Sequence, residues 1–259
     1  MTKVLEVGPL RVAYTQMGAG PALLLLHGGE GSHHMFDAVM PLLSRHFNVL
    51  AYDQRDCGET QGPSTASSLR ELAGDAAAFL RAAGLERAHV YGSSFGGRIA
   101  QTLAIEYPDV VDRLVLGATW PLSHALADLS PNIADILRLR AGLPETSSEL
   151  AAYFLPASFL ETRPELRNLF RAATPATARA QRRAQAIDDN PPHDISRIRA
   201  STLVLIGEVD RVVPPSVTLG LAERVPHAQV ATMEGVGHAA VLQAPDLVSN
   251  HVTRFCLNP

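Results

Sequence analysis

Short apolar runs alternate along the chain with longer stretches in which apolar residues recur at helical spacing. The short runs predict buried strands over residues 22–26, 48–52, 87–91, 111–117, 201–206 and 229–233. The longer stretches predict helices over residues 36–47, 69–83, 98–105 and 244–255. Two alternating runs, residues 4–7 and 10–16, are separated by a Gly-Pro pair and predict an opening hairpin. Apolar strands that alternate with helices predict an α/β fold, with a mostly parallel central sheet covered by helices on both faces.

The pattern changes in the middle of the chain. Residues 121–196 are nearly all helix-forming, are rich in Ala, Leu and Arg, and are interrupted by prolines. The alternation of strands and helices resumes at residue 201. We therefore expect a helical cap over residues 121–196, inserted into a core that residues 1–120 and 197–259 form together.

Composition and charge limit the classes of partner. The 259 residues are enough for one large α/β domain with an insertion, and 46% hydrophobic with 19% charged residues is typical of a globular enzyme. The net charge of −4 argues against nucleic acid as the main partner. The first residues do not resemble a signal peptide, and the longest apolar stretch, residues 22–26, is too short to span a bilayer. Cys57 and Cys256 are too few for a disulfide framework. We expect a cytoplasmic protein that binds a small molecule and no membrane, and the oligomeric state stays open.

A serine in a glycine-rich turn is the first candidate for chemistry. Ser94 is the central residue of the run Gly-Ser-Ser-Phe-Gly at residues 92–96, between a predicted strand and a predicted helix. A G-x-S-x-G turn in this context presents the serine hydroxyl above the edge of the sheet. The glycines on either side let the backbone and the helix approach without a Cβ clash. Ser94 is therefore a candidate nucleophile.

A serine nucleophile needs a base, and the base needs an acid to orient it. His238 follows the last predicted strand, is flanked by glycines and is the candidate base. Asp210 follows the predicted strand 201–206 and is the candidate acid, with Glu208 as the local competitor. Loops after the carboxyl ends of parallel strands are where such a sheet builds its site.

The order Ser94, Asp210, His238 is that of the α/β-hydrolase triad, and the chain resembles that superfamily over essentially its whole length. The resemblance implies that these three residues form a catalytic triad. The run His-Gly-Gly at residues 27–29 resembles the oxyanion-hole turn of the family. This implies that the backbone N–H groups of Gly29 and Phe95 bind the oxyanion. No cofactor and no metal are expected.

A second loop narrows the resemblance. Residues 53–60, Asp-Gln-Arg-Asp-Cys-Gly-Glu-Thr, look like the D-x-R-G-x-G-x-S loop of the family. Together with the His-Gly-Gly turn, this loop is similar to the branch that contains proline iminopeptidases. Glu30 and Asp56 depart from that branch, in which a proline and a glycine are usual at these positions. Aspartate tolerates a left-handed φ better than most residues, which favours an unchanged loop shape. Arg55 is interpreted as structural, paired with backbone or with a nearby carboxylate.

Three polar residues after the oxyanion turn have alternative interpretations. Glu30 either faces solvent or helps to select a cationic substrate, because a carboxylate that pointed inward would oppose the developing negative charge. His33 and His34 are adjacent, so in an extended chain they point to opposite sides, which is poor spacing for metal ligands. One of them is a candidate to line the pocket.

The inserted helices carry candidate pocket residues. In relatives of this family, helices inserted at this point form a cap over the serine and set substrate choice. By that resemblance, four aromatic residues are candidates for an apolar pocket wall: Trp120, Phe154, Phe159 and Phe170. Aromatic residues at such spacings also form the core of a cap.

The resulting prediction is a serine hydrolase that cleaves a small carboxylic ester, lactone or thioester through an acyl-enzyme. The same resemblance leaves two other enzymes open, a proline iminopeptidase-type aminopeptidase and a carbon–carbon bond hydrolase. A non-catalytic ligand receptor or a cofactor-free oxygenase is the alternative from a different class, because a fold does not dictate function.

Overall fold

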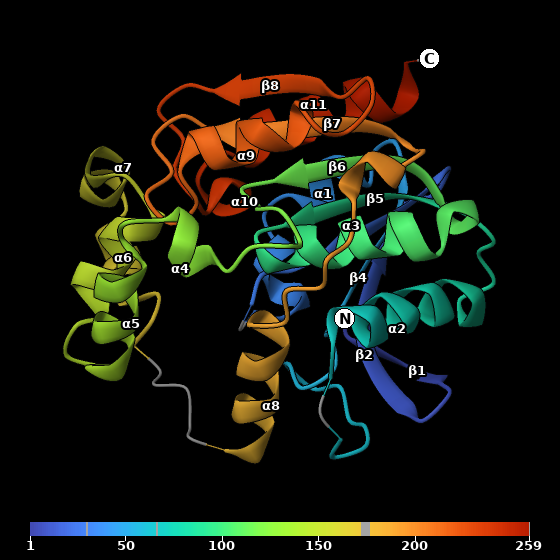
Figure 1. Cartoon of the computed structure of the whole chain (residues 1–259), viewed down its shortest axis with the longest axis horizontal. Coiled ribbons are helices and arrows are strands. Elements are labelled where there is room, and N and C mark those ends of the chain that lie inside the picture. The colour runs from blue at the N-terminus through green and yellow to red at the C-terminus, as the bar shows by residue number, and fades with distance from the viewer. Residues whose placement is uncertain (30, 66, 172–176, 259) are drawn as a thin grey trace.

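The computed structural model describes residues 1–29, 31–65, 67–171 and 177–258, and within them eight strands form one sheet (Figure 1). The strands are β1 (Lys3–Val7), β2 (Leu10–Met17), β3 (Ala22–Leu26), β4 (Asn48–Tyr52), β5 (Ala88–Ser93), β6 (Val111–Gly117), β7 (Ser201–Gly207) and β8 (Gln229–Met233). They lie in the order β1-β2-β4-β3-β5-β6-β7-β8. β2 pairs antiparallel with β1 and β4, and the other neighbouring pairs are parallel. The predicted α/β fold with a mostly parallel sheet is confirmed.

The central strands bury side chains on both faces of the sheet. Along β3, Leu24 and Leu26 belong to one hydrophobic cluster, and Leu23 and Leu25 belong to a second. Successive side chains of a strand point to opposite faces, so both faces of β3 are covered. This explains why the central strands appear in the sequence as continuous apolar runs.

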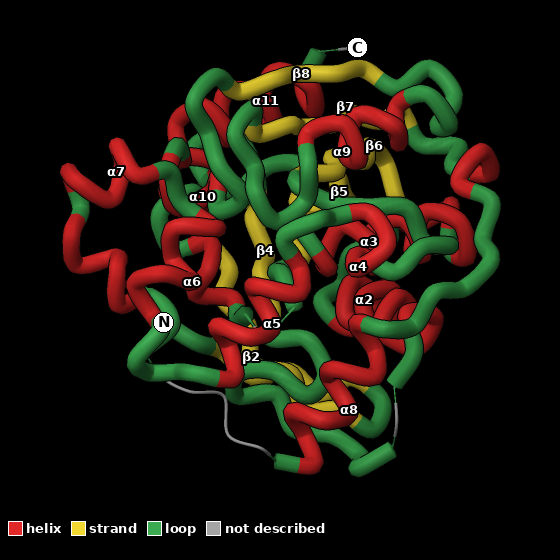
Figure 2. The backbone as a smooth tube through the Cα atoms, turned by 60° about the vertical axis from the view of Figure 1, so that its left-hand side comes forward, coloured by secondary structure: helices red, strands yellow, loops and turns green. Residues whose placement is uncertain are grey.

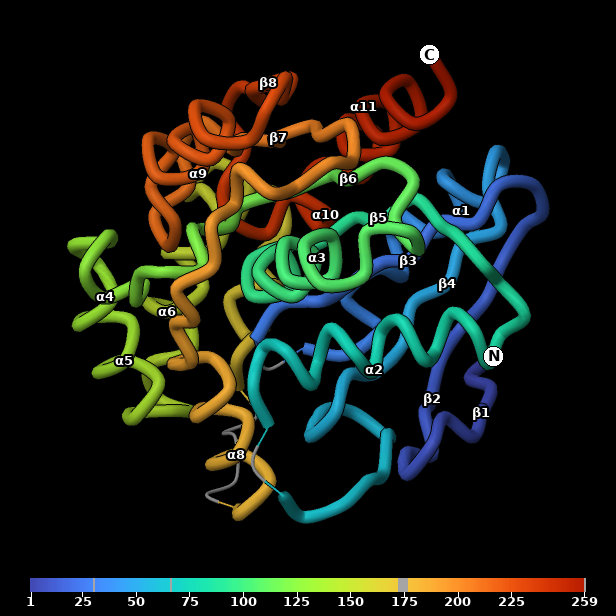
Figure 3. Tube along the Cα trace, turned by 45° about the vertical axis from the view of Figure 1, so that its right-hand side comes forward, coloured from blue at the N-terminus to red at the C-terminus, as the bar shows by residue number. Residues whose placement is uncertain are grey.

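Helices cover both faces, as predicted. α2 (Leu69–Ala82), α3 (Phe95–Glu106) and α9 (Pro215–Ala222) pack on the face of the first cluster, where Figure 3 shows α2 and α3 side by side. The opposite face carries η1 (His33–Phe36), α1 (Met40–Leu43), α10 (Ala240–Gln243) and α11 (Pro245–Leu257). Two further 3-10 helices, η2 (Pro108–Val110) and η4 (Ile195–Arg197), precede β6 and β7.

Two helices differ from the prediction. The single helix predicted over residues 36–47 is wrong, because the structure has η1, a turn and the short α1 in its place. Pro41 explains the break: it has no N–H, and its ring clashes with the carbonyl four residues earlier, so a helix tolerates it only in the first turn. The unpredicted α9 carries its apolar residues on all sides and therefore shows no helical periodicity in the sequence.

The chain between β6 and β7 forms a helical insertion at one end of the sheet. It contains α4 (Leu126–Leu129), α5 (Ile133–Ala141), α6 (Ser147–Phe154), α7 (Ala157–Thr162), η3 (Pro164–Asn168) and α8 (Ala178–Ile187). Helices α4–α7 lie beyond the ends to which the arrows of β6 and β8 point in Figure 1, and Figure 2 shows them from the side. Helix α8 lies apart from this group in Figure 1. The division into core and cap at residues 121 and 196 stays a prediction.

Over the described ranges, no helix is both long enough and apolar enough to cross a membrane.

Candidate active site

Ser94 lies in a sharp turn between β5 and α3. Its backbone has φ 56° and ψ −124°, a strained conformation for a residue other than glycine. Its N–H donates to the carbonyl of Gly117 on β6 at 2.9 Å. A Cβ on Gly92 would lie 2.4 Å from the carbonyl oxygen of Gly96, and one on Gly96 would lie 2.1 Å from that of Leu26. The turn therefore requires glycine at both positions, and it holds Ser94 at the carboxyl ends of β3 and β5.

The side chains of Ser94, His238 and Asp210 form one hydrogen-bonded chain. His238 Nε2 lies 3.1 Å from Ser94 Oγ, and His238 Nδ1 lies 2.9 Å from Asp210 Oδ2. Asp210 Oδ1 accepts the N–H groups of Val212 and Val213 at 2.8 and 2.9 Å, which fixes the orientation of the carboxylate. Because an ionised carboxylate only accepts hydrogen bonds, His238 carries its proton on Nδ1 and leaves Nε2 free for the serine proton. This is the geometry that a serine nucleophile needs.

Asp210, and not Glu208, is the carboxylate hydrogen-bonded to His238. The Asp210 side chain is 2% exposed and that of His238 is 6% exposed. Glu208 is exposed, and its Oε2 accepts the N–H of Gly235 at 2.9 Å. Glu208 thus supports the loop that carries His238 from the solvent side.

The turn after β3 passes beside the serine. A Cβ on Gly28 would lie 3.5 Å from Ser94 Cβ and 3.9 Å from Ser94 Oγ. The N–H of Gly29 has no hydrogen-bond partner among the residues that the structure describes. The N–H of Phe95 belongs to the first turn of α3, where N–H groups have no partner within the helix. Both groups are therefore available as oxyanion donors.

His27 orients this turn as a neutral imidazole. Its Nδ1 donates to the carbonyl oxygen of Gly28 at 2.8 Å, and its Nε2 accepts the N–H of Gln54 at 3.1 Å. Only an imidazole protonated on Nδ1 satisfies both contacts. Burial, together with the nearby charge of Arg183, lowers the pKa of His27 to about 3. Since the C=O and N–H of a trans peptide point in opposite directions, fixing the Gly28 carbonyl fixes the direction of the Gly29 N–H.

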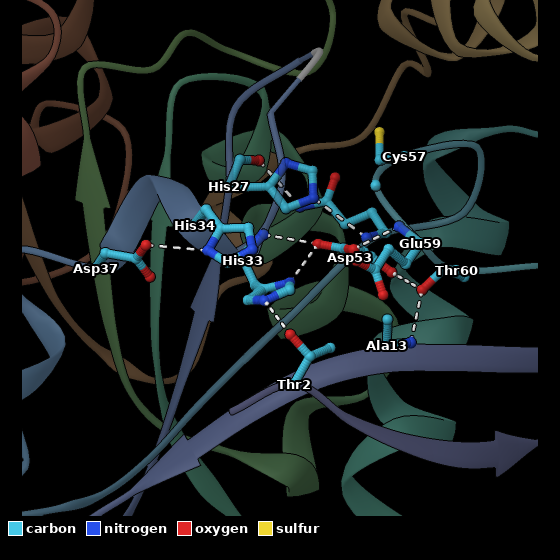
Figure 4. A network of polar contacts seen from close by, with 12 residues as sticks. Thr2, Ala13, His27, His33, His34, Asp37, Asp53, Cys57, Glu59 and Thr60 are labelled. Carbon is cyan, nitrogen blue, oxygen red and sulfur yellow. Dashed lines mark hydrogen bonds and ion pairs between the residues drawn. The ribbon is translucent and has the colours of Figure 1, made fainter.

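Asp53 anchors the loop of residues 53–60 next to the oxyanion turn (Figure 4). Its Oδ1 accepts the backbone N–H and the Nδ1–H of His33, both at 2.7 Å, and its Oδ2 accepts the N–H of Glu59 at 2.7 Å. Burial alone would raise the pKa of Asp53, but these hydrogen bonds hold it below its usual range. His33 is buried and also contacts the Thr2 hydroxyl at 3.3 Å. His33 is thus a partner of Asp53 and not a pocket residue.

The neighbouring charged residues pair away from the serine. Arg55 makes a bidentate ion pair with Asp75 on α2, with both N···O distances at 2.8 Å. His34 is exposed and pairs with Asp37 at 3.0 Å. Glu30, for which two interpretations were open, lies outside the described residues.

Comparison with known proteins decides the family. The family model described as alpha/beta hydrolase fold matches residues 21–245. The chain belongs to the α/β-hydrolase fold family. The resemblance inferred from the sequence is confirmed, and this α/β-hydrolase, with a serine in the nucleophile turn, is a serine hydrolase.

Named relatives of this α/β-hydrolase include two hydrolases of Pseudomonas. It is 32% identical over 255 residues to a 2-hydroxy-6-oxo-2,4-heptadienoate hydrolase of Pseudomonas putida, covering 91% of this chain and 89% of that protein. It is 31% identical over 265 residues to a 2-hydroxymuconate semialdehyde hydrolase of a Pseudomonas species, covering 95% of this chain and 88% of that protein. The crystal structure of a hydrolase from Pseudomonas aeruginosa PA01 matches with a TM-score of 0.81 at 29% identity, covering 99% of this chain and 98% of the other.

Of the four aromatic candidates, the structure brings Phe154 to the site of the α/β-hydrolase. Its ring lies edge-on to His238, with 5.3 Å between ring centroids. Its carbonyl accepts the N–H of Ala239 at 3.0 Å, so the end of α6 is tied to the histidine loop. Phe170 packs against Phe154 with 4.6 Å between centroids.

The other two aromatic candidates have different surroundings. Phe159 packs against a small cluster of the insertion that contains Ala151, Leu155 and Leu160. Trp120 is 2% exposed and belongs to the large cluster on the α2–α3 face of the sheet. Both have the environment of core residues rather than of a wall beside His238.

Arg98 is a buried residue that the sequence analysis missed. It lies on α3 and stacks over the Trp120 ring at 5.0 Å from the centroid. Its guanidinium donates to the carbonyl of Leu122 at 2.5 Å, to that of Ile187 at 3.1 Å and to Asn190 Oδ1 at 3.1 Å. Helix α3 thereby contacts the insertion near both of its ends.

Helix α8 presents Arg179, Arg182 and Arg183 to the loops of the core, and these residues were also missed. Arg179 donates to the carbonyls of Gly58 and Thr60 at 3.0 and 2.9 Å. Arg182 pairs with Asp56 at 2.6 Å, and Asp56 has the left-handed φ of 63° that its position requires. The spacing of three and four residues places these arginines on one helix face, which is the only signal of this contact in the sequence.

Proposed function

We propose that this protein hydrolyses a small carboxylic ester, lactone or thioester through an acyl-enzyme on Ser94. The observation that supports the proposal is the hydrogen-bonded chain from Ser94 Oγ through His238 to Asp210. The N–H groups of Gly29 and Phe95 lie beside it without a hydrogen-bond partner in the described part of the chain. In the first step His238 Nε2 takes the hydroxyl proton while Ser94 Oγ bonds to the carbonyl carbon. The carbonyl oxygen becomes an anion and accepts hydrogen bonds from the N–H groups of Gly29 and Phe95.

Breakdown of the tetrahedral intermediate completes the cycle. The bond to the leaving group breaks, and the leaving oxygen or sulfur takes the proton from His238. Water then attacks the acyl carbon and gives a proton to His238. The second intermediate expels Ser94 Oγ, which recovers that proton, and the carboxylic acid is released. Phe154 beside His238 offers an apolar wall to a small acyl group.

A carbon–carbon bond hydrolase is the second candidate, and a specific observation favours it. The two Pseudomonas relatives are named as hydrolases of 2-hydroxy-6-oxo-2,4-heptadienoate and of 2-hydroxymuconate semialdehyde. Their alignments cover at least 88% of both chains in each pair. Such a reaction uses the same site, but the leaving group departs through a carbon atom. That carbon must receive a proton as the carbon–carbon bond breaks.

Turnover by wild type and by Ser94→Ala separates these functions. The substrates are p-nitrophenyl acetate and butyrate, a γ-lactone followed by pH-stat, 2-hydroxy-6-oxo-2,4-heptadienoate followed by absorbance, and proline p-nitroanilide. Ester or lactone turnover that the variant lacks supports the proposal. A kcat/KM for the dienoate more than 100-fold above that for the best ester favours the second candidate. Turnover of the anilide alone indicates an aminopeptidase. Absence of wild-type turnover with every one of these substrates contradicts the proposal.

A further inference from the structure

The side chain of Arg183, from α8 of the insertion, packs against the oxyanion turn. Its Nε donates to the carbonyl of Gly29, and its Nη2 lies 3.4 Å from the carbonyl of Gly28. Nη2 also donates to Gln54 Oε1. The guanidinium carbon lies 4.6 Å from the centroid of the Phe95 ring. A single side chain thus contacts both residues whose N–H groups are the proposed oxyanion donors.

The charge of Arg183 distinguishes it from its neighbour on α8. Arg182 forms an ion pair with Asp56, whereas Arg183 has no carboxylate partner among the residues that the structure describes. Arg183 is 2% exposed, and its Nη1 is buried without a hydrogen-bond partner in the same ranges. A buried cation whose charge no carboxylate of the described residues offsets is unfavourable for folding. Next to a developing oxyanion, the same positive charge is favourable.

We propose that Arg183 is a positioning residue of the oxyanion hole, which holds the Gly28–Gly29 turn so that the Gly29 N–H faces the carbonyl oxygen under attack at Ser94. The peptide between Gly28 and Gly29 carries this N–H opposite to the Gly28 carbonyl, so a donor on that carbonyl sets the direction of the N–H. His27 holds the carbonyl from the core and Arg183 holds it from the insertion.

The consequence is a second route by which the insertion acts on the reaction. Phe154 packs against His238, where it would limit the room for the acyl group. Arg183 would instead affect the stability of the tetrahedral intermediate. This inference rests on the proposed hydrolysis at Ser94. A purely structural role, in which Arg183 only docks α8 on the core, is the alternative that the experiment must separate.

The test compares Arg183→Met and Arg183→Lys with the control Arg182→Met. The control removes a docking contact from the same helix but touches neither residue of the turn. Active sites are titrated with a fluorophosphonate, and kcat and KM are measured with p-nitrophenyl butyrate. The second readout is the inhibition constant of a trifluoromethyl ketone, to whose carbonyl carbon Ser94 Oγ adds, which leaves an oxyanion in the hole.

Loss of one oxyanion donor in a serine protease lowers kcat by about 10²–10³. We expect Arg183→Met to lower kcat per active site by about 10- to 100-fold, with KM within about threefold. The affinity for the ketone should weaken by the same factor as kcat/KM. Arg183→Lys keeps the positive charge but loses the planar guanidinium with its several N–H donors. Its kcat should lie between those of wild type and Arg183→Met. If Arg183→Met does not fold, Arg183→Lys gives the same test, with a smaller loss expected.

Arg182→Met should keep kcat per active site and the inhibition constant of the ketone within about threefold of wild type, whatever its melting temperature. The inference is overturned if an Arg183 variant keeps kcat and the ketone affinity per active site, or if Arg182→Met loses as much as Arg183→Met. Absence of wild-type ester turnover would instead contradict the proposed function, so the two failures are distinct.

Discussion

The ring of Phe154 stands at 79° to the imidazole of His238, with 5.3 Å between the centroids. The carbonyl of Phe154 also accepts the N–H of Ala239, the residue that follows the histidine. The end of α6 and the histidine loop are therefore held together through backbone and side chain. An aromatic residue of the insertion thus shapes the space in which His238 moves its proton.

Phe154→Ala should shift the substrate preference toward longer acyl groups, because removal of the ring opens space beside His238. A hydrophobic pocket contact of this kind changes selectivity by roughly 1–3 kcal/mol. The ratio of kcat/KM for p-nitrophenyl octanoate to that for the acetate should rise at least about tenfold. Leu137→Ala, at a position on α5 that is 60% exposed, is the control and should leave the ratio unchanged. An unchanged ratio in Phe154→Ala would show that this ring does not line the acyl pocket.

Asp210→Asn should abolish most activity while the protein stays folded. The asparagine oxygen can still accept the N–H groups of Val212 and Val213, but its NH₂ donates to His238 Nδ1 and moves the imidazole proton to Nε2. The corresponding change in a serine protease lowers kcat about 10⁴-fold, and we expect a loss of that order. Steady-state kinetics and the melting temperature measure the two effects.

Glu208→Gln provides the comparison for Asp210→Asn. Its carboxylate meets Gly235 and not the histidine, so kcat should stay within about twofold of wild type. Equal losses in the two variants would contradict the assignment of Asp210 as the orienting acid.

His27 should make the protein less stable in mild acid. The folded-state pKa is about 3, below the ordinary value of 6.5, so between these values the unfolded chain binds a proton that the folded protein does not. The free energy of unfolding is therefore unaffected by this group above about pH 6.5. It falls as the pH is lowered toward 3, by up to about 1.4 kcal/mol per pH unit.

Urea unfolding at pH 6.5, 5.5 and 4.5 measures this slope. His27→Asn lacks the titrating group, and its slope should be smaller by about one proton. The lowered pKa of Asp53 also favours loss of stability in acid, but it is common to both proteins. Equal slopes would show that His27 is not buried as a neutral imidazole.

Arg98→Met should destabilise the protein because it removes the donor to the buried carbonyl of Leu122 and to two part-buried acceptors, the carbonyl of Ile187 and the side-chain oxygen of Asn190. We expect a loss of roughly 2–4 kcal/mol in the free energy of unfolding, measured by urea titration. Arg138→Met removes an arginine that is 66% exposed and pairs with Asp135, and should change stability by less than about 0.5 kcal/mol. Similar losses in both variants would show that Arg98 does not hold the insertion.

Local signals explain what the sequence could predict. Glycine spacing marks the turn of Ser94, and the ends of predicted strands mark Asp210 and His238, so their grouping followed from the topology of a parallel sheet. Pro41 is an equally local signal, and it explains why the single helix predicted over residues 36–47 does not form.

Long-range docking explains what the sequence could not predict. Arg98 and Arg183 look like any other arginine of a chain rich in that residue, since their partners are backbone carbonyls and the neutral side chains of Asn190 and Gln54, which no charge pattern reveals. Which carbonyls they meet depends on how the insertion packs on the core. Aromatic spacing likewise does not separate Phe154, beside the histidine, from Trp120, inside the core.

The most direct measurement of the central claim is the intact mass of the protein, quenched in acid within the first turnovers of p-nitrophenyl butyrate. We predict a wild-type species heavier by one butyryl group, located by peptide mapping on the peptide that contains Ser94, and no such species in Ser94→Ala. An acyl group on another residue, or full ester turnover by Ser94→Ala, would contradict the account.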